Sequence, residues 1–291
     1  MSSGICIFGE VLFDHFPDGS RVLGGAPFNV AWNLQGLGEN VRFISRVGDD
    51  DEGRTIREAM HRHGMDDASL QQDGQQPTGR VSVSFSNNEP AYDIVAPCAY
   101  DRIQPENLPP GECGMLYHGT LGLRDPVSRQ ALQGLLDSRP VSVFLDVNLR
   151  PPWWEKADVL SWVDRADWVK LNADELQQLA DINHPDGNGA RGFLQAHGLQ
   201  GLILTRGSAG AEVLTADGQH LTVVPESQTA VVDTVGAGDA FAAVMLLGLV
   251  RNWPLQQTLH RAQAFASAQV GQRGATVSDP AYYRKFIDTW N

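Results

Sequence analysis

Cysteine is scarce in this sequence, which has only Cys6, Cys98 and Cys113 among its 291 residues. Their number is odd and their spacing is wide, which argues against a disulfide framework and leaves no C-x-x-C pair for a metal or redox site. Thiols without either arrangement are typical of proteins kept in a reducing compartment. The cysteine content therefore predicts a cytoplasmic location.

Long apolar runs are missing as well. The longest, "AFAAVMLLGLV" at 240–250, is too short to cross a bilayer as a helix. The first residues, "MSSGICIFGEVLFDHF", have no basic segment and soon contain the acids Glu10 and Asp14, unlike a signal peptide. We therefore expect no membrane as a partner.

Basic residues are also few compared with acidic ones. The 22 Lys and Arg residues face 35 Asp and Glu residues, giving a formal net charge of −13. Such a field repels polyanions, so nucleic acid is not an expected partner, although a local site can still bind a small phosphate. Apolar residues make up 42% and charged residues 20% of the chain, a balance typical of folded globular proteins. We predict one α/β domain over residues 1–291.

Short apolar runs typical of buried strands alternate with stretches of helical periodicity. From residue 238 onward the pattern is almost entirely helical. This alternation predicts an α/β fold with a mainly parallel central sheet and helices on both of its faces. The predicted strands are 4–9, 41–48, 114–119, 141–148, 167–172 and 201–207, and the predicted helices include 26–37, 51–63, 126–138, 173–181, 254–271 and 279–290.

Residues 78–95, "TGRVSVSFSNNEPAYDIV", interrupt this rhythm, because polar and apolar residues alternate with a period of two around "NNEP". The pattern predicts a hairpin with one wet face and no attached helix. Ligands of α/β sheets bind beyond the carboxyl ends of the strands, where such a hairpin would exclude water. We predict a small β lid formed by about residues 11–23 and 78–97.

Residues 232–243, "VDTVGAGDAFAA", place small residues and an aspartate at the start of an apolar helix. Free N–H groups of Gly236, Ala237 and Gly238 would suit an anion there, and a phosphate could approach the backbone closely. Asp239 beside it could take a proton from an attacking alcohol. The structural alternative is an aspartate favoured at a helix start, with glycines that fit a tight turn.

A second Gly-rich element, "GGAPFNVAWNLQGLG" at 24–38, leads through a proline into a helix that carries Asn29 and has an apolar opposite face. Its backbone could lie against a polyol while Asn29 bonds to the hydroxyls. Taken alone, this element is better explained as a Gly-rich turn with Asn29 facing solvent than as a polyol-binding site.

Together the two elements resemble the motifs of the ribokinase-like sugar kinases, the phosphofructokinase-B family. The match runs from "GE" at 9–10 to "GAT" at 274–276, and "GEVLFD", "GGAPFNVA", "PTGRVSVSF" and "DVNLRPPWW" are most similar to fructokinases and related ketose kinases. The resemblance implies a three-layer α/β/α sandwich with a small β lid. It also implies that ATP, with Mg²⁺, phosphorylates a monosaccharide hydroxyl, with D-fructose as the expected acceptor.

The resemblance also implies the roles of single residues. Asp239 matches the catalytic base, and the N–H groups of Gly236, Ala237 and Gly238 match the anion hole.

Sugar-binding positions of the family are matched by Asp14, Gly25 and Asn29. A carboxylate can accept from two neighbouring hydroxyls, although Asp14 alone could equally be a loop acid. Arg80 on the lid could contact an acidic sugar or simply face water.

Nucleotide contacts are implied for Thr205 and Gly207 in "TRGSAGA" and for Asn172 and Glu175 in "LNADEL", where Glu175 would hold Mg²⁺ through water. The structural alternatives are a hairpin turn and a capping box. Arg150 in "DVNLR" is a candidate phosphate or substrate contact.

Asp233, Gly274 and Ser278 match positions around a monovalent-cation site, K⁺ in some family members. The expected partners are thus a small-molecule sugar and ATP, with a homodimer as the expected assembly.

Other kinase and dinucleotide motifs are absent from the sequence, which has no G-K-[ST], no H-R-D or D-F-G, and no G-x-G-x-x-G after the first strand. The rival enzymes are a 2-keto-3-deoxygluconate kinase, another ketose or ribose kinase, and a nucleoside kinase. A rival of another class is a non-catalytic sensor of sugar or nucleotide. The presence of Asp239 in its cradle of small residues argues against a sensor, because mere binding needs no base.

Overall fold

The computed structural model describes residues 4–86, 89–107, 113–138, 141–182, 187–225 and 232–290. Its main element is a nine-stranded sheet in which seven adjacent strands, from β5 to β11, run parallel, while β12 and β13 form an antiparallel edge. The predicted mainly parallel sheet is confirmed. In spatial order the strands are β13 (His220–Val223), β12 (Ala211–Thr215), β11 (Gly201–Thr205), β10 (Trp168–Asn172), β9 (Ser142–Asp146), β8 (Met115–His118), β1 (Ile5–Phe8), β4 (Val41–Gly48) and β5 (Leu70–Asp73).

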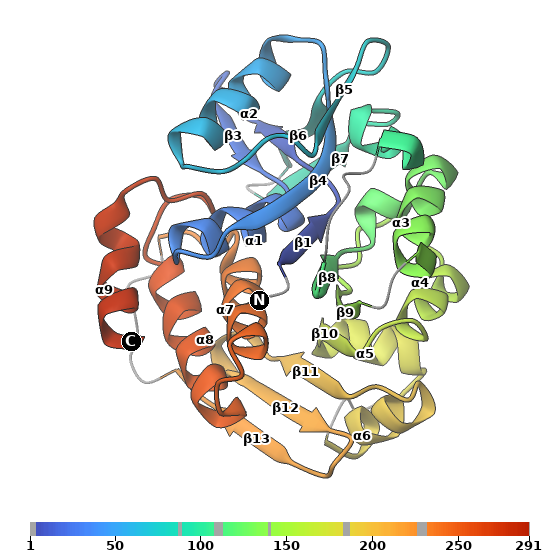
Figure 1. Cartoon of the computed structure of the whole chain (residues 1–291), viewed down its shortest axis with the longest axis vertical. Coiled ribbons are helices and arrows are strands. Elements are labelled where there is room, and N and C mark those ends of the chain that lie inside the picture. The colour runs from blue at the N-terminus through green and yellow to red at the C-terminus, as the bar shows by residue number, and fades with distance from the viewer. Residues whose placement is uncertain are drawn as a thin grey trace.

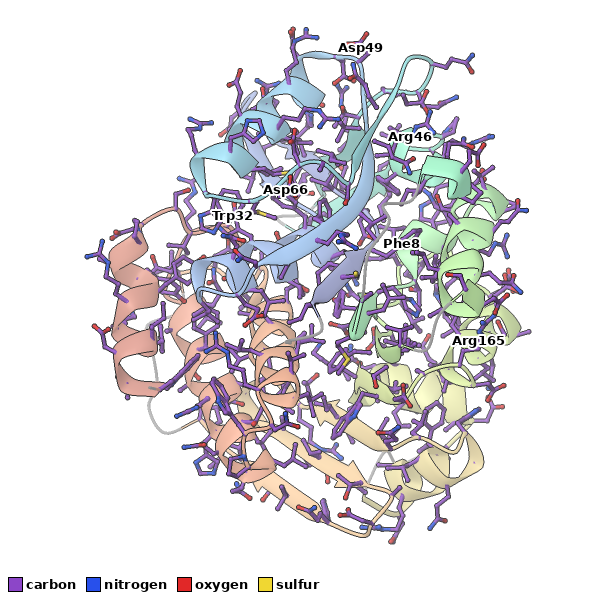
Figure 2. The ribbon with its side chains drawn as sticks, in the orientation of Figure 1. Phe8, Trp32, Arg46, Asp49, Asp66 and Arg165 are labelled. Atoms are coloured by element: carbon purple, nitrogen blue, oxygen red, sulfur yellow. The ribbon has the colours of Figure 1, made fainter. Side chains whose placement is uncertain are left out.

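Strand side chains alternate between two helix layers, as the period of two requires. In β1, Ile5 and Ile7 join the core beneath one layer, whereas Cys6 and Phe8 join the core beneath the other. Figure 1 shows the layers on either side of the sheet, and in Figure 2 Phe8 lies in the interior. The predicted three-layer sandwich is confirmed. The first layer contains α1 (Ala26–Gly36), α2 (Asp51–Arg62), α7 (Ala237–Val250), α8 (Leu255–Gln269) and α9 (Pro280–Trp290); the second contains α3 (Pro126–Ser138), α4 (Lys156–Val163), α5 (Ala173–Ala180) and α6 (Gly187–Ala196).

Helix α7 is deeply buried in the first layer. Every residue from 240 to 248 is buried, as expected for a helix that is apolar on all sides. It packs against α1 and α8. This packing fixes the position of the helix start, where the predicted catalytic residues lie.

A second, four-stranded sheet forms the lid, in the order β3 (Arg21–Gly24), β2 (Leu12–His15), β6 (Gly79–Ser86) and β7 (Glu89–Ile94). The predicted hairpin is confirmed as the antiparallel pair β6 and β7, although 87–88 within the predicted turn lie outside the described residues. Because β2 pairs with β6, the two predicted lid segments join in one sheet. Its inner face packs Leu12, Val81 and Ile94 against Tyr100 and Leu121.

Within the described ranges, no helix is both long and apolar enough to cross a membrane.

Candidate active site

Asp239 and Asn29 meet although 210 positions separate them in the chain. Asp239 lies in the first turn of α7, and Asn29 Nδ2 in α1 donates a 2.8 Å hydrogen bond to its Oδ2. The Asn29 side chain is buried, and the Asp239 side chain remains partly exposed. The packing of α1 against α7 thus brings the two predicted motifs into direct contact.

The surroundings of Asp239 make it a stronger base than an ordinary aspartate. Burial is the largest cause, and it raises the pKa of Asp239 to about 6. The carboxylate of Asp146 raises this pKa further, while the Asn29 hydrogen bond and the charges of Lys170 and Arg150 oppose the change. A carboxylate with this pKa is still ionised at neutral pH, so it is suited to accept a proton.

The start of α7 requires glycine at Gly236. Its φ of +78° is left-handed, and a Cβ atom there would lie 2.3 Å from the Cβ of Ala275. Of the three predicted N–H donors, that of Ala237 makes a long 3.4 Å turn bond to the carbonyl of Thr234. Gly238 is exposed in the first helical turn, which leaves the backbone there open to an approaching group.

A buried ion pair beside this helix start was not anticipated from the sequence. Lys170 Nζ on β10 donates to both carboxylate oxygens of Asp146 on β9, at 2.9 and 2.8 Å, and the hydroxyl of Tyr117 donates to the same carboxylate. Burial is the largest single influence on the pKa of Lys170 and lowers it. The charge and hydrogen bonds of Asp146, together with the charges of Asp239 and Glu175, raise this pKa by more in sum, so the net change is upward. Lys170 Nζ lies 3.6 Å from the position that a Cβ atom on Gly238 would take. A permanent positive charge therefore adjoins the predicted anion hole.

The predicted sugar-binding residues converge on the turn that precedes α1. A Cβ atom on Gly24 would lie 3.7 Å from Asp14 Oδ2 and 3.9 Å from Asn29 Oδ1, so both oxygens face the same small space. Gly25 has a φ of +110°, and a Cβ atom there would lie 2.7 Å from the carbonyl oxygen of Glu10. Among the described residues, Asn29 Oδ1 has no hydrogen-bond partner. Burial raises the pKa of Asp14 to about 6, against the opposing charge of Arg150.

Arg80 is not brought to this cluster. The parallel register pairs Asp14 with Val81 and Phe13 with Arg80, so the Arg80 side chain leaves the opposite face of the lid sheet. There its Nη2 lies 3.8 Å from Glu52 Oε2. The structure therefore places Arg80 away from Asp14 and Asn29.

Asn172 and Glu175 form a capping box at the start of α5, which is the structural alternative to a nucleotide and magnesium site. Asn172 Oδ1 accepts from the N–H of Glu175, and Glu175 Oε2 accepts from the N–H of Asn172. Glu175 Oε1 accepts from the N–H of Leu149, so each carboxylate oxygen already bonds to the backbone. Burial raises the pKa of Glu175. A magnesium ion would fit this carboxylate only through its own water ligands.

The other predicted nucleotide contacts lie at neighbouring strand ends. Thr205 ends β11, and Gly207 follows in the turn to β12 with a φ of +55°. That turn joins antiparallel strands, so the alternative of a hairpin connection is confirmed. Arg150 is exposed beyond β9, and its charge acts on both Asp14 and Asp239.

Asp233 joins the two segments of the predicted monovalent-cation site. Its Oδ1 accepts from the N–H of Val235 and its Oδ2 from the N–H of Gly274, both at 3.0 Å, while Ser278 is exposed nearby in sequence. Gln269 Nε2 donates to the carbonyl of Gly274. Carboxylate and carbonyl oxygens of this kind fit a hard cation. In the part of the chain that the structure describes, no three His, Cys, Asp or Glu side chains form a metal-binding group.

Glu10 is a second residue that the sequence did not single out for a role. It follows β1, only 3% of its surface is exposed, and burial raises its pKa to about 7. The neighbouring Asp239 raises this pKa further, whereas Arg150 and Arg124 lower it. The "GE" at 9–10 was the signal that could have drawn attention to it.

Comparison with known proteins decides the family. A model described as pfkB family carbohydrate kinase matches residues 6–281. The chain belongs to the pfkB family. It is a carbohydrate kinase, which phosphorylates a sugar with ATP, and the predicted family and enzyme class are confirmed.

Relatives of this pfkB kinase differ in substrate. Fructokinase of Klebsiella pneumoniae is 34% identical over 266 residues, which cover 86% of this chain and 85% of the relative. Aminoimidazole riboside kinase of Salmonella typhimurium is 31% identical over 297 residues, 95% of this chain and 92% of the relative. A Vibrio cholerae O395 fructokinase double mutant with bound fructose, ADP and potassium ion has a TM-score of 0.85 at 26% identity, with 98% of both chains covered.

Proposed function

We propose that this kinase is a fructokinase, which transfers the terminal phosphoryl group of ATP to a hydroxyl of D-fructose. The observation that carries the proposal is the contact between Asn29 and Asp239, because it puts a sugar-binding amide next to a base of raised pKa. The similarity to fructokinases supports the choice of acceptor.

In the proposed reaction, Asp14 and Asn29 bind hydroxyls of the sugar over the turn at Gly24 and Gly25. Asp239 accepts the proton of the attacking hydroxyl as its oxygen bonds to the terminal phosphorus and the bond to ADP breaks. The backbone of Gly236–Gly238 stabilises the charge that develops on the transferred group.

Lys170 is assigned a part in the same step. Its ammonium group lies beside the first turn of α7 and is held there by two hydrogen bonds to Asp146. A fixed positive charge at this place stabilises a transferring phosphoryl group without reorganisation during the reaction.

The nucleotide is assigned to the neighbouring strand ends, with Thr205, Gly207, Asn172 and Arg150 as contacts. Glu175 would hold Mg²⁺ through water, and bound magnesium would neutralise phosphate charge. We assign a K⁺ site to Asp233, Gly274 and Ser278, supported by the potassium ion in the Vibrio cholerae relative. We further propose one kinase domain over residues 1–291 in the cytoplasm.

A nucleoside kinase is the second candidate, because similarity to an aminoimidazole riboside kinase covers 95% of this chain. The first test is a coupled ADP-release assay over about a dozen sugars and nucleosides. We expect D-fructose to give the highest kcat/KM. Turnover confined to a riboside or a keto-deoxy acid would overturn the fructokinase proposal but not the family.

The pH dependence of this activity provides a second prediction. Because the pKa values of Asp239 and Asp14 are raised to about 6, the ionised forms that the reaction needs are lost as the pH falls through 6. We expect kcat/KM for the sugar to fall steeply below about pH 6 and to be flat above about pH 7, with two protons involved. Asp14→Asn should reduce this to one proton. A constant kcat/KM between pH 5 and pH 7 would contradict the assignment.

A further inference from the structure

Side chains from three strands of the lid, one histidine and two arginines, lie around the carboxylate of Glu52 in α2. His15 Nε2 on β2 lies 2.8 Å from Glu52 Oε1, and Arg21 Nη1 on β3 lies 3.1 Å from the same oxygen. Arg80 Nη2 on β6 lies 3.8 Å from Oε2. The Glu52 side chain is only 11% exposed, so water screens these contacts less than it would at the open surface.

A second contact joins the same end of α2 to the lid. Asp50 caps α2 by accepting from the N–H of Gly53, and it also accepts from the N–H and the hydroxyl of Thr78, which precedes β6. Figure 1 shows α2 beside the lid strands, and in Figure 2 Asp49 marks the turn from β4 into α2. Because Ile56 and Met60 of α2 belong to the main core, these contacts tie the lid to the body of the protein.

The alternation of side chains along β2 connects this anchor to the sugar site. His15 and Asp14 are adjacent, so they leave opposite faces of the lid sheet. On the outer face, His15 lies against Glu52, whereas Asp14 points inward to the space that it shares with Asn29 Oδ1 above Gly24. A shift of His15 would therefore move Asp14 as well.

We propose that Glu52 is a positioning residue for the sugar: it anchors the lid strands to α2 and so holds Asp14 in its binding position. The inference rests on the proposed role of Asp14 in sugar binding. Without the charge on Glu52, the guanidinium groups of Arg21 and Arg80 would remain close together with no carboxylate between them, and their mutual repulsion would displace the strands.

The test is the steady-state kinetics of Glu52→Gln, which keeps the size of the side chain and removes its charge. We expect KM for D-fructose, or for whichever panel sugar is turned over, to rise roughly 10-fold, because small displacements of a binding group are costly. Both kcat and KM for ATP should stay within about 2-fold. Glu58→Gln, an exposed position on the same helix, is the matched control and should change nothing. Melting temperatures identify any variant that is merely unstable.

The coupling between Glu52 and Asp14 is measured with the double variant. In an Asp14→Asn background, Glu52→Gln should raise KM for the sugar no further, since there is no longer a carboxylate to position. If Asp14→Asn raises KM but Glu52→Gln does not, or if the two effects add, the anchoring role of Glu52 is wrong. The sugar-binding role of Asp14 would then still stand. If Asp14→Asn leaves KM unchanged, the sugar-binding role of Asp14 fails, and the anchoring role fails with it. Should Glu52→Gln not fold, His15→Gln removes the shortest contact and must raise the same KM by about 3-fold.

Discussion

Asp239→Asn is expected to lower kcat by roughly 10²- to 10⁴-fold, the range for loss of a positioned general base. Asparagine has nearly the same size, and its Oδ1 can still accept the hydrogen bond that Asn29 Nδ2 donates to Asp239. Only the basicity is lost. KM for the sugar and for ATP should change little, because the groups assigned to binding remain in place. The measurement is kcat at saturating substrates, with the melting temperature recorded for the same preparation.

A matched control separates this role from that of a helix-start aspartate. Asp158 lies in the first turn of α4, as Asp239 does in α7, but it is exposed and pairs with Arg129. Asp158→Asn should leave kcat unchanged. If Asp239 served only to stabilise the start of α7, its replacement would cost at most about 1 kcal/mol of stability. Near-normal turnover of folded Asp239→Asn would refute the general base.

The fold could be predicted largely because periodicity is a local property. The alternation of apolar runs and helical stretches identified the parallel sheet, and the period of two at 78–95 identified the lid hairpin. The antiparallel edge strands β12 and β13 were not among the predicted strands. Their pairing depends on turns at 206–210 and 216–219, and the sequence of the first turn predicts either a nucleotide-binding element or a hairpin.

The residues of the proposed site could be selected from the sequence where they lie in a motif, but not where their placement depends on strand register. Arg80 shows the difference. The alternation of polar and apolar residues at 78–95 predicts that Arg80 lies on a lid strand, but only the pairing of Phe13 with Arg80 shows from which face of the sheet its side chain extends. Lys170 lies in "DWVKLN", which has the pattern of a buried strand. A charged lysine there is stabilised because the register places Asp146 of β9 directly beside it. No local pattern contains that information.

Lys170→Met, which breaks the buried ion pair of Lys170 and Asp146, is the second variant for which we expect a large effect. Methionine fills a similar volume but leaves the carboxylate of Asp146, which is 2% exposed, with the Tyr117 hydroxyl as its only remaining partner among the described residues. Breaking a buried pair in this way costs about 3 to 5 kcal/mol of unfolding free energy. Removal of a fixed positive charge beside the position proposed for the transferred phosphoryl group should also lower kcat by roughly 10²- to 10³-fold. Chemical denaturation and steady-state kinetics measure the two effects separately.

The double variant Lys170→Met/Asp146→Asn distinguishes a structural pair from a catalytic one. A neutral amide at position 146 no longer leaves a buried charge uncompensated, and it can still accept the hydrogen bond from Tyr117. Most of the lost unfolding free energy should therefore return. The turnover number should not return, since no cation then lies 3.6 Å from the Cβ position at Gly238. Recovery of kcat together with stability would show that Lys170 serves only to neutralise Asp146.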